Sequence, residues 1–158
     1  MRERAVEEGQ PCLVVFQDFK RAFETVDRGL LLQKLKNWYG IDGNLFDWLE
    51  SFLSDRYQKV RYNKCVSDTL LIDDGVPQGS KLGPLLFLLC INDLPEVLVE
   101  CSIHLFADDA ILYIRGETSD EVVNIVNQEL INVWEWLKKN KLCLEVKKTI
   151  CIVFGKRS

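Results

Sequence analysis

The sequence contains few of the residues that build metal clusters or disulfide scaffolds. Its 158 residues include one histidine, His104, and six cysteines, none of them in a Cys-x-x-Cys pair. A structural zinc site is therefore not expected, because such sites need four Cys or His ligands at close spacing. The longest apolar run, Leu85 to Ile91, is too short to span a bilayer, and we expect no signal peptide. We expect a protein of the nucleus or cytoplasm, neither secreted nor bound to a membrane.

Basic residues are also scarce for a free-standing nucleic-acid binder. Twenty Lys and Arg residues stand against 24 Asp and Glu residues, which gives a net charge of −4. From residue 138 onward, however, Glu145 is the only acid among seven basic residues: Lys138, Lys139, Lys141, Lys147, Lys148, Lys156 and Arg157. This run is typical of an edge that faces phosphates, although a solvated helix end would explain it equally well.

Predicted strands and helices are interspersed along the chain, with no repeat or linker. Hydrophobic residues make up 47% of the sequence, enough for one packed core. Residues 1–10 are expected to be a frayed remnant, followed by one domain over residues 11–158. Its α+β fold should place helices on one face of an antiparallel sheet. Strands are predicted at residues 12–16, 57–62, 69–72, 102–107, 110–114 and 150–154, and helices after Asp27, after Gly43, and over residues 81–99 and 119–140.

Two adjacent aspartates, Asp108 and Asp109, fall where the 102–107 and 110–114 strands meet. Successive side chains of a strand point to opposite faces, but a tight turn lets both acids point toward one edge. Two acids there repel each other and need a counter-charge, which a metal ion supplies. The alternative is a solvated Asp-Asp turn.

A third acid, Asp18, follows the first predicted strand. If this strand lies beside the 108–109 hairpin, three carboxylates converge at one edge of the sheet. Magnesium prefers oxygen ligands, and two such ions with a nucleotide would suit the three acids. Convergence itself does not follow from the sequence.

A constrained loop, Gly75-Val76-Pro77-Gln78-Gly79-Ser80-Lys81-Leu82-Gly83-Pro84, enters the 81–99 helix. Gly79 allows close approach to a ligand, and the helix N-terminus offers free N–H groups. The loop matches neither a phosphate loop of the Gly-x-x-x-x-Gly-Lys type nor the dinucleotide-binding glycine pattern.

Three motifs in this order resemble reverse transcriptases, in particular the LINE-like and jockey-like (non-LTR) retrotransposon enzymes. They are Asp18 with Ala22-Phe23, the loop Gly75 to Pro84, and Phe106-Ala107-Asp108-Asp109; Lys148-Thr149 resembles the motif that follows. The resemblance covers nearly the whole chain, about residues 11–155. It implies the palm of a polymerase that copies an RNA template by adding dNTPs to a DNA primer.

The resemblance also implies site residues. Asp18, Asp108 and Asp109 would be catalytic and would hold two Mg²⁺ ions, or Mn²⁺ instead, with the Phe19 carbonyl as a further ligand. Arg21 and Ala22 would line the triphosphate path, and Phe23 would exclude a ribose 2′-hydroxyl. Gln78 and Gly79 would lie under the template base and incoming nucleotide. Lys148 would donate a proton to pyrophosphate, with a surface lysine as the alternative.

The sequence departs from the family at two positions and in its extent. Glu24 stands where Asp is usual and Glu145 where Asn is usual; Glu145 weakens the role of Lys148. We expect the fingers to be mostly absent, and the thumb and endonuclease segments of a longer polyprotein to be missing. Two alternatives are a catalytically inactive remnant that binds RNA or protein and, less compatible with Phe23, a magnesium phosphohydrolase.

Overall fold

The computed structural model describes residues 10–155, which form two compact units. Residues 10–20 and 91–155 make up one, here called the sheet unit, and residues 21–90 make up the other, the helical unit. The expected frayed segment, residues 1–10, lies outside the described residues except for Gln10. No helix in residues 10–155 combines the length and apolar character needed to cross a bilayer.

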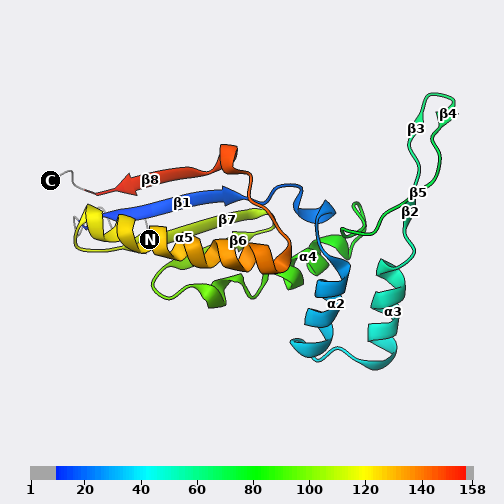
Figure 1. Ribbon diagram of the computed structural model, residues 1–158, viewed down its shortest axis with the longest axis horizontal. Helices are drawn as coiled ribbons and strands as arrows, with labels where there is room; N and C mark the ends of the chain where they lie inside the picture. The colour runs from blue at the N-terminus through cyan, green and yellow to red at the C-terminus, as the bar shows by residue number, and fades with distance from the viewer. Residues whose placement is uncertain (1–9, 156–158) are drawn as a thin grey trace. The chain divides into compact units, whose positions relative to one another are not determined.

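A four-stranded antiparallel sheet forms the centre of the sheet unit. Its strand order is β6-β7-β1-β8, from β6 (Ser102–Phe106), β7 (Asp109–Arg115), β1 (Cys12–Asp18) and β8 (Ile150–Phe154). The predicted first strand thus extends two residues further and ends on Asp18. The helix α5 (Ser119–Asn140) lies along one face of this sheet (Figure 1). The expected α+β arrangement, with a helix on one face of an antiparallel sheet, is confirmed.

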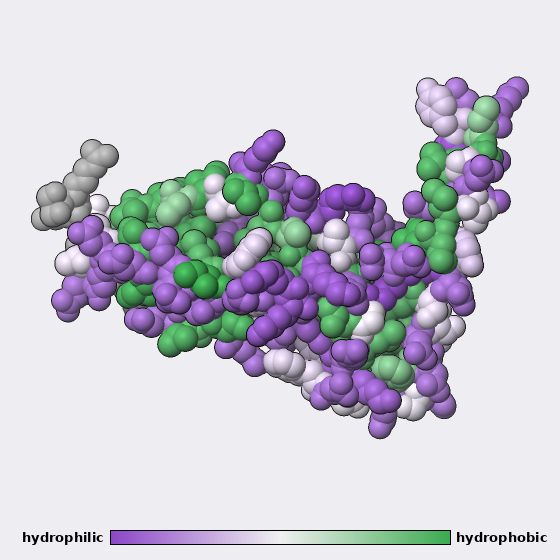
Figure 2. All heavy atoms as spheres, viewed as in Figure 1, coloured by the Kyte–Doolittle hydropathy of each residue, from purple (hydrophilic) through white to green (hydrophobic). Residues whose placement is uncertain are grey.

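The core of this unit lies between the sheet and α5. Alternate residues of β1 point toward the helix, as the period of a strand requires, and Leu13 and Val15 are buried against Val122 and Val126. The opposite face of β1 and β8 exposes Phe16 and several apolar neighbours, and Figure 2 shows hydrophobic side chains gathered over β8. Helix α5 has the predicted bounds because Thr118 and Glu121 form a capping box at its start.

The helical unit contains three α-helices and a ribbon of short strands. Asp27 caps α2 (Arg28–Asn37) by accepting a 2.8 Å hydrogen bond from the Leu30 amide. Helix α3 (Gly43–Leu53) follows, and a short 3₁₀ turn, η1 (Ala22–Glu24), precedes α2. Trp48 shares helical spacing with Leu45, Leu49 and Phe52, which predicts a core position for it, but 52% of Trp48 is exposed. It stacks on Phe52 at the surface instead.

The predicted 81–99 helix is shorter than expected. Helix α4 (Gly83–Ile91) ends before a separate 3₁₀ turn, η2 (Leu94–Val97), in which Pro95 stands near the start. Within the helical unit, Lys34 and Tyr39 donate hydrogen bonds to the last carbonyls of α4, those of Cys90 (2.6 Å) and Leu89 (2.9 Å). The last carbonyls of an α-helix lie beyond its regular backbone hydrogen bonds, so the two side chains help to stabilise this end.

Residues 57–71 form two consecutive two-stranded ribbons. The strand β2 (Tyr57–Gln58) pairs with β5 (Leu70–Leu71), and β3 (Arg61–Tyr62) pairs with β4 (Cys65–Val66). The prediction of two strands, 57–62 and 69–72, was therefore wrong in detail: four two-residue strands form, and β4 lies between the two predicted ranges. Figure 1 shows the ribbon projecting from the end of α3.

Candidate active site

Three acidic residues lie at one end of the sheet. Asp18, the last residue of β1, is the direct cross-strand partner of Asp109, the first residue of β7. Partners in an antiparallel pair project from the same face, so these two carboxylates lie on one side of the sheet. Asp108 stands in the turn between β6 and β7, where its carbonyl accepts a 3.0 Å hydrogen bond from the Phe19 amide. The strand register therefore brings together the stretches that carry all three predicted acids.

The turn that carries Asp108 is tight. Its other residue, Ala107, has a φ of 51°, in the left-handed region that a residue with a Cβ seldom adopts. The bond from Phe19 and the Phe106–Asp109 pairing close this turn on both sides. The sequence signal for the turn was the acid pair alone, because alanine is not a typical residue for this conformation.

Lys148 reaches the same carboxylates from the other side of β1. Its ammonium group forms an ion pair with Asp18 Oδ2, and only 15% of the Asp18 side chain is exposed. The hydrogen bond to Asp18 and the charge of its carboxylate are the main causes that raise the pKa of Lys148, and Glu145 and Asp108 add to the effect. The lysine predicted to act at this site therefore contacts Asp18, and its raised pKa makes its ammonium group a weaker acid than an ordinary lysine.

Backbone hydrogen bonds attach the Lys148 segment to the end of β1. The Glu145 amide donates to the Asp18 carbonyl at 2.8 Å, and the Lys20 amide donates to the Cys143 carbonyl, also at 2.8 Å. The 3₁₀ turn η3 (Val146–Lys148) then carries Lys148 toward Asp18. Glu145 was expected to weaken the role of Lys148. Its charge makes the ammonium group a weaker acid, and its backbone helps to position that group.

The donor set at this edge suits a hard cation. Carboxylate oxygens are the preferred ligands of Mg²⁺ and Mn²⁺, and one cation, the Lys148 ammonium, already contacts Asp18. Within residues 10–155, no three His, Cys, Asp or Glu side chains are grouped closely enough to hold a metal ion. An ion there would have to replace the lysine at Asp18.

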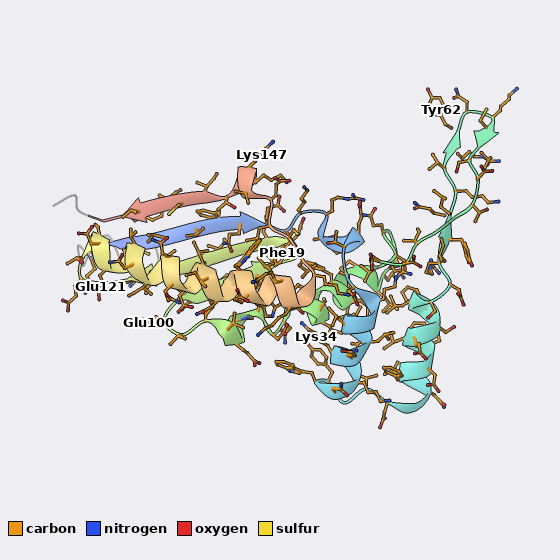
Figure 3. The ribbon with its side chains drawn as sticks, viewed as in Figure 1. Phe19, Lys34, Tyr62, Glu100, Glu121 and Lys147 are labelled. Atoms are coloured by element: carbon orange, nitrogen blue, oxygen red, sulfur yellow. The ribbon has the colours of Figure 1, made fainter. Side chains whose placement is uncertain are left out.

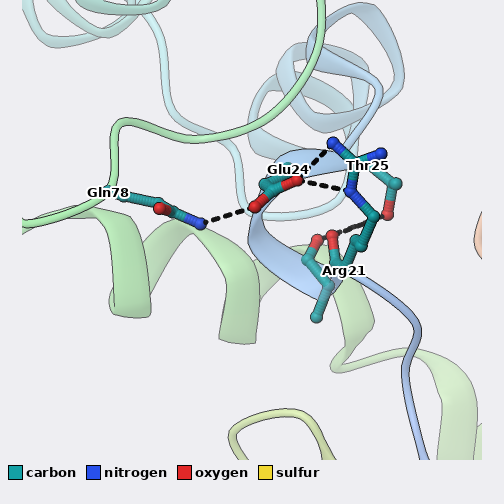
Figure 4. A network of polar contacts seen from close by, with 5 residues as sticks. Arg21, Glu24, Thr25 and Gln78 are labelled. Atoms are coloured by element: carbon teal, nitrogen blue, oxygen red, sulfur yellow. Dashed lines mark hydrogen bonds and ion pairs between the residues drawn. The ribbon is translucent and has the colours of Figure 1, made fainter. Parts of the chain in front are cut away.

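The other predicted site residues lie in the helical unit. Glu24 joins two of them: it forms an ion pair with Arg21 and accepts a 3.2 Å hydrogen bond from Gln78 Nε2 (Figure 4). The left-handed Arg21, with a φ of 51°, turns the chain into η1, where Ala22 is buried. Glu24, noted only as a departure from the family pattern, thus connects the predicted triphosphate and template residues.

Phe23 leans against helix α4. Its ring centroid lies 4.9 Å from that of Phe87, with 42° between the ring planes. The Phe23 carbonyl accepts a 2.8 Å hydrogen bond from Val76, which fixes the backbone on the other side of the ring. Because Phe87 is fully buried, the position of the Phe23 ring is set by a rigid neighbour.

The glycine-proline loop is pressed against residues 23–26. The Gly75 amide donates to the Val26 carbonyl at 2.7 Å, and a Cβ on Gly75 would lie 2.7 Å from the Glu24 carbonyl oxygen. Gly79, in contrast, has open space around it and is exposed. Ser80 accepts a 2.9 Å hydrogen bond from the Gly83 amide and so caps α4. The loop is thus fixed at both ends and open at Gly79.

Arg28 is the residue that sequence reasoning missed. Its guanidinium donates three hydrogen bonds to the backbone before the loop: to the carbonyls of Ile72 (2.6 Å), Asp74 (2.9 Å) and Gly75 (2.7 Å). Burial is the main cause that lowers the pKa of Arg28, and the nearby Arg56 adds to it, against the opposing charges of Asp74 and Asp73. No motif marks this residue, because its partners are backbone atoms more than 40 residues away.

A cavity of about 520 Å³ opens in the helical unit beside this network. Arg21, Arg28 and Gln78 line it together with Arg56 and Tyr57 from the base of the ribbon. Its lining is rich in guanidinium groups, and Glu24 and Asp74 offset their charge only in part. Such a cavity suits an anionic or hydrogen-bonding ligand.

Comparisons with known proteins agree with this arrangement. The family model described as reverse transcriptase (RNA-dependent DNA polymerase) matches residues 2–153. The chain is 28% identical, over 93% of its length, to a probable RNA-directed DNA polymerase from transposon X-element of Drosophila melanogaster, of which it covers 17%. It is 29% identical, over 88% of its length, to the RNA-directed DNA polymerase from mobile element jockey of Drosophila funebris, of which it covers 16%. The chain thus spans about a sixth of these relatives.

Solved structures with the same fold include apo telomerase from Candida tropicalis truncated from its C-terminal domain. The TM-score is 0.70 at 14% identity, and the match covers 99% of this chain and 34% of that one. At this identity the likeness establishes the fold, which is the polymerase palm expected from the motifs. With the family model matched over nearly its full length, the chain belongs to the reverse transcriptase (RNA-dependent DNA polymerase) family, as a domain of the non-LTR retrotransposon kind.

Proposed function

We propose that the acidic end of the sheet is the catalytic centre of an RNA-directed DNA polymerase. The observation that carries the proposal is the cross-strand pairing of Asp18 with Asp109, next to Asp108 and in contact with Lys148. In the reaction, the primer 3′-hydroxyl oxygen would attack the α-phosphorus of a dNTP. The bond to the β-phosphate would break, and pyrophosphate would leave.

Asp18, Asp108 and Asp109, with the Phe19 carbonyl, would hold two Mg²⁺ or Mn²⁺ ions. When bound, these ions would lower the pKa of the attacking hydroxyl and stabilise charge on the leaving group. The carboxylates would fix where the positive charge of the ions lies, because a β-ladder, and not a flexible loop, holds Asp18 and Asp109. The two-residue turn restricts Asp108 in the same way.

Lys148 would serve this centre in two stages. Before substrate binds, its ammonium group neutralises Asp18 and so reduces the repulsion among the three carboxylates. Once released from Asp18, it can donate a proton to the departing pyrophosphate, which becomes more basic as it leaves. The ammonium group keeps its proton at neutral pH even after it leaves Asp18, because the ordinary pKa of a lysine side chain is about 10.4.

Residues of the helical unit would bind the substrates. Arg21 and Ala22 would line the triphosphate path, and Gln78 and Gly79 would contact the template base and the incoming nucleotide. Phe23 would exclude a 2′-hydroxyl, because its ring is braced by Phe87 and cannot move aside without disturbing packed core. The chain would accordingly prefer deoxynucleotides.

The full activity would also need partners that the relatives' length suggests. An RNA template, a DNA primer and dNTPs are the proposed substrates. Fingers, thumb and endonuclease segments of a longer polyprotein would supply much of the surface that grips them. We propose that this polyprotein works inside the cell, in the nucleus or cytoplasm.

A primer-extension assay on an RNA template tests the proposal. Asp108→Asn keeps the size of the side chain but removes its charge, and it should lower extension by at least about a hundredfold because several kcal/mol of charge stabilisation are lost. Asp120→Asn, an exposed acid at the start of α5, is the matched control and should extend normally. If the folded chain extends no primer, the alternative of an inactive remnant is favoured. If Asp108→Asn extends as the parent does, the acidic end of the sheet is not the catalytic centre.

A further inference from the structure

The ribbon between α3 and the glycine-proline loop is an exposed arm. We call residues 56–71 the arm. Ser67 joins its two short ribbons: its amide donates to the Val60 carbonyl at 2.9 Å, and its hydroxyl accepts from the Val60 amide at 2.9 Å. At its base, the Ile72 amide donates to the Arg56 carbonyl at 2.8 Å. Every residue of the arm is exposed, and the guanidinium of Arg56 at its base lies 5.7 Å from the centroid of the Phe52 ring on α3.

The arm differs in charge from the rest of the chain. Four cations, Arg56, Lys59, Arg61 and Lys64, precede its only acid, Asp68, whereas the whole chain has a net charge of −4. Figure 2 shows hydrophilic side chains at the tip of the arm and hydrophobic ones along its stem. Concentration of positive charge on an exposed ribbon attracts a polyanion.

Two tyrosines stand among these cations. Tyr62 at the tip is 77% exposed, and its ring points to solvent (Figure 3). Tyr57 in the stem is 62% exposed and also lines the cavity that Arg21, Arg56 and Gln78 share. Exposed aromatic rings between cations are typical of surfaces on which single-stranded bases stack.

We propose that the arm binds a single strand of nucleic acid. Its Lys and Arg side chains would contact consecutive phosphates, and Tyr62 would stack on a base. Tyr57 and Arg56 would lead the strand into the cavity. The strand is the RNA template only if the proposed function holds, but binding to the arm does not depend on catalysis.

A protein partner is the competing occupant. Apolar residues of the arm, Val60, Val66, Leu70 and Leu71, are exposed and could pack against another chain. The charges favour nucleic acid, because the arm carries four cations against one acid and lysines are depleted from the centre of protein interfaces.

Binding of a labelled RNA oligonucleotide of about 12 nucleotides, which fits one such site, tests the proposal by fluorescence anisotropy. EDTA is present and dNTPs are absent, so that catalysis plays no part. Arg61→Gln with Lys64→Gln should weaken binding about tenfold and reduce the salt slope by about 0.7 for each phosphate that the arm no longer neutralises. Lys36→Gln removes one positive charge from an exposed position on α2 and should change neither quantity.

The aromatic contribution is tested separately. Tyr62→Ala should weaken binding to single strands of RNA or DNA about tenfold while leaving the salt slope unchanged, since stacking releases no counterions. Trp134→Ala, an exposed aromatic on α5, is the control and should bind as the parent does. Binding to a duplex should be insensitive to Tyr62→Ala, because its bases are already stacked.

Two results would overturn the proposal. One is unchanged RNA affinity and salt slope in the Arg61→Gln/Lys64→Gln chain. The other is unchanged RNA binding together with loss of self-association or of a protein complex, which would assign the arm to a protein partner. A chain that extends no primer but loses RNA binding through the arm residues would refute the polymerase and still support the arm.

Discussion

The acidic edge and the glycine-proline loop are positioned in different ways. Asp18 and Asp109 are placed by the register of a continuous β-ladder, in which neighbouring backbone pairs support one another. The loop of the helical unit depends on one side chain, Arg28, and on the close approach of Gly75 to residues 23–26. The comparison indicates that single substitutions should disturb the loop far more than the edge.

The largest difference is expected between Arg28→Ala and Lys148→Met. Arg28→Ala leaves two part-buried carbonyls and one exposed carbonyl without their charged donor, and it should lower the free energy of unfolding by about 3 kcal/mol. Lys148→Met removes an exposed ammonium group and should lower the free energy of unfolding far less than Arg28→Ala does. Urea unfolding measures both, and hydrogen exchange should show faster exchange at residues 75–76 only in Arg28→Ala. Equal losses of unfolding free energy in Arg28→Ala and Lys148→Met would contradict the view that the loop depends on one side chain and the acidic edge does not.

Two glycines of the loop provide a sharper test. Gly75 (φ 82°) and Gly79 (φ 76°) have similar backbones, but only Gly75 has backbone atoms where a Cβ would stand. Gly79→Ala should therefore cost about 1 kcal/mol for conformation alone, and Gly75→Ala should cost about 2–3 kcal/mol because the clash is added. Thermal or urea unfolding of the pair gives the difference. Comparable losses would mean that the loop can move away from Glu24.

The sheet unit has one loop that does depend on a side chain. Glu129 on α5 is 2% exposed, and its carboxylate accepts hydrogen bonds from the amides of Val99 (2.8 Å), Glu100 (2.6 Å) and Cys101 (3.4 Å). Burial works to raise its pKa, but these bonds and one from Asn132 outweigh burial and lower it. Burial and the charges of Glu129 and Glu100 raise the pKa of the Cys101 thiol to about 11.

The hydrogen bonds of Glu129 depend on pH, and the direction follows from the lowered pKa of its carboxyl group. The carboxylate stabilises the fold fully above its unfolded-state pKa, about 4.3, and loses this effect as the pH falls through the lower folded-state value. Glu129→Gln should cost about 1–3 kcal/mol at pH 7, and the difference from the parent should shrink below about pH 4. Glu135→Gln, an exposed acid on the same helix, should show almost no difference at either pH.

The smallest effect is expected at Glu24. Its contacts with Arg21 and Gln78 are exposed, so Glu24→Gln should change the free energy of unfolding by less than about 0.5 kcal/mol. Under the proposed function it should instead raise the KM for dNTP, because Arg21 and Gln78 lose their common partner. A stability loss as large as that of Arg28→Ala would show that the network supports the loop as a whole.

Much of the sheet unit could be predicted from the sequence. Helix α5 and strand β8 both have the predicted bounds. An amphipathic period and a capping box mark the helix, and an uninterrupted run of β-forming residues marks the strand. The arm was predicted only in outline. A strand of two residues is too short to show the alternation of apolar and polar residues that marks a strand. The sequence therefore did not predict the additional strand Cys65–Val66. The exposure of Trp48 was also not predictable, since helical spacing does not say which helix faces remain open.

The candidate site was predictable in its residues but not in its contacts. Motifs pointed to Asp18, Asp108 and Asp109, yet only the register shows that Asp18 faces Asp109. Lys148 is 130 residues from Asp18, and sequence spacing carries no information about a contact over that separation. Arg28 was missed because it binds carbonyl groups, which every residue has. Local patterns therefore identified the acids, and long-range hydrogen bonds determined what surrounds them.

The far end of β1 has its own consequence. Cys12 pairs with Phe154, and a Cβ on Gly155 would lie 2.9 Å from the Pro11 Cα, so positions 11 and 155 are immediate neighbours. The strand β1 runs for seven residues, from Cys12 at this corner to Asp18, a span of roughly 20 Å. Polypeptide fused ahead of residue 10 or behind residue 155 would thus attach at a single shared corner. Tags or reporter proteins placed at either terminus should leave the carboxylate end of the sheet unobstructed.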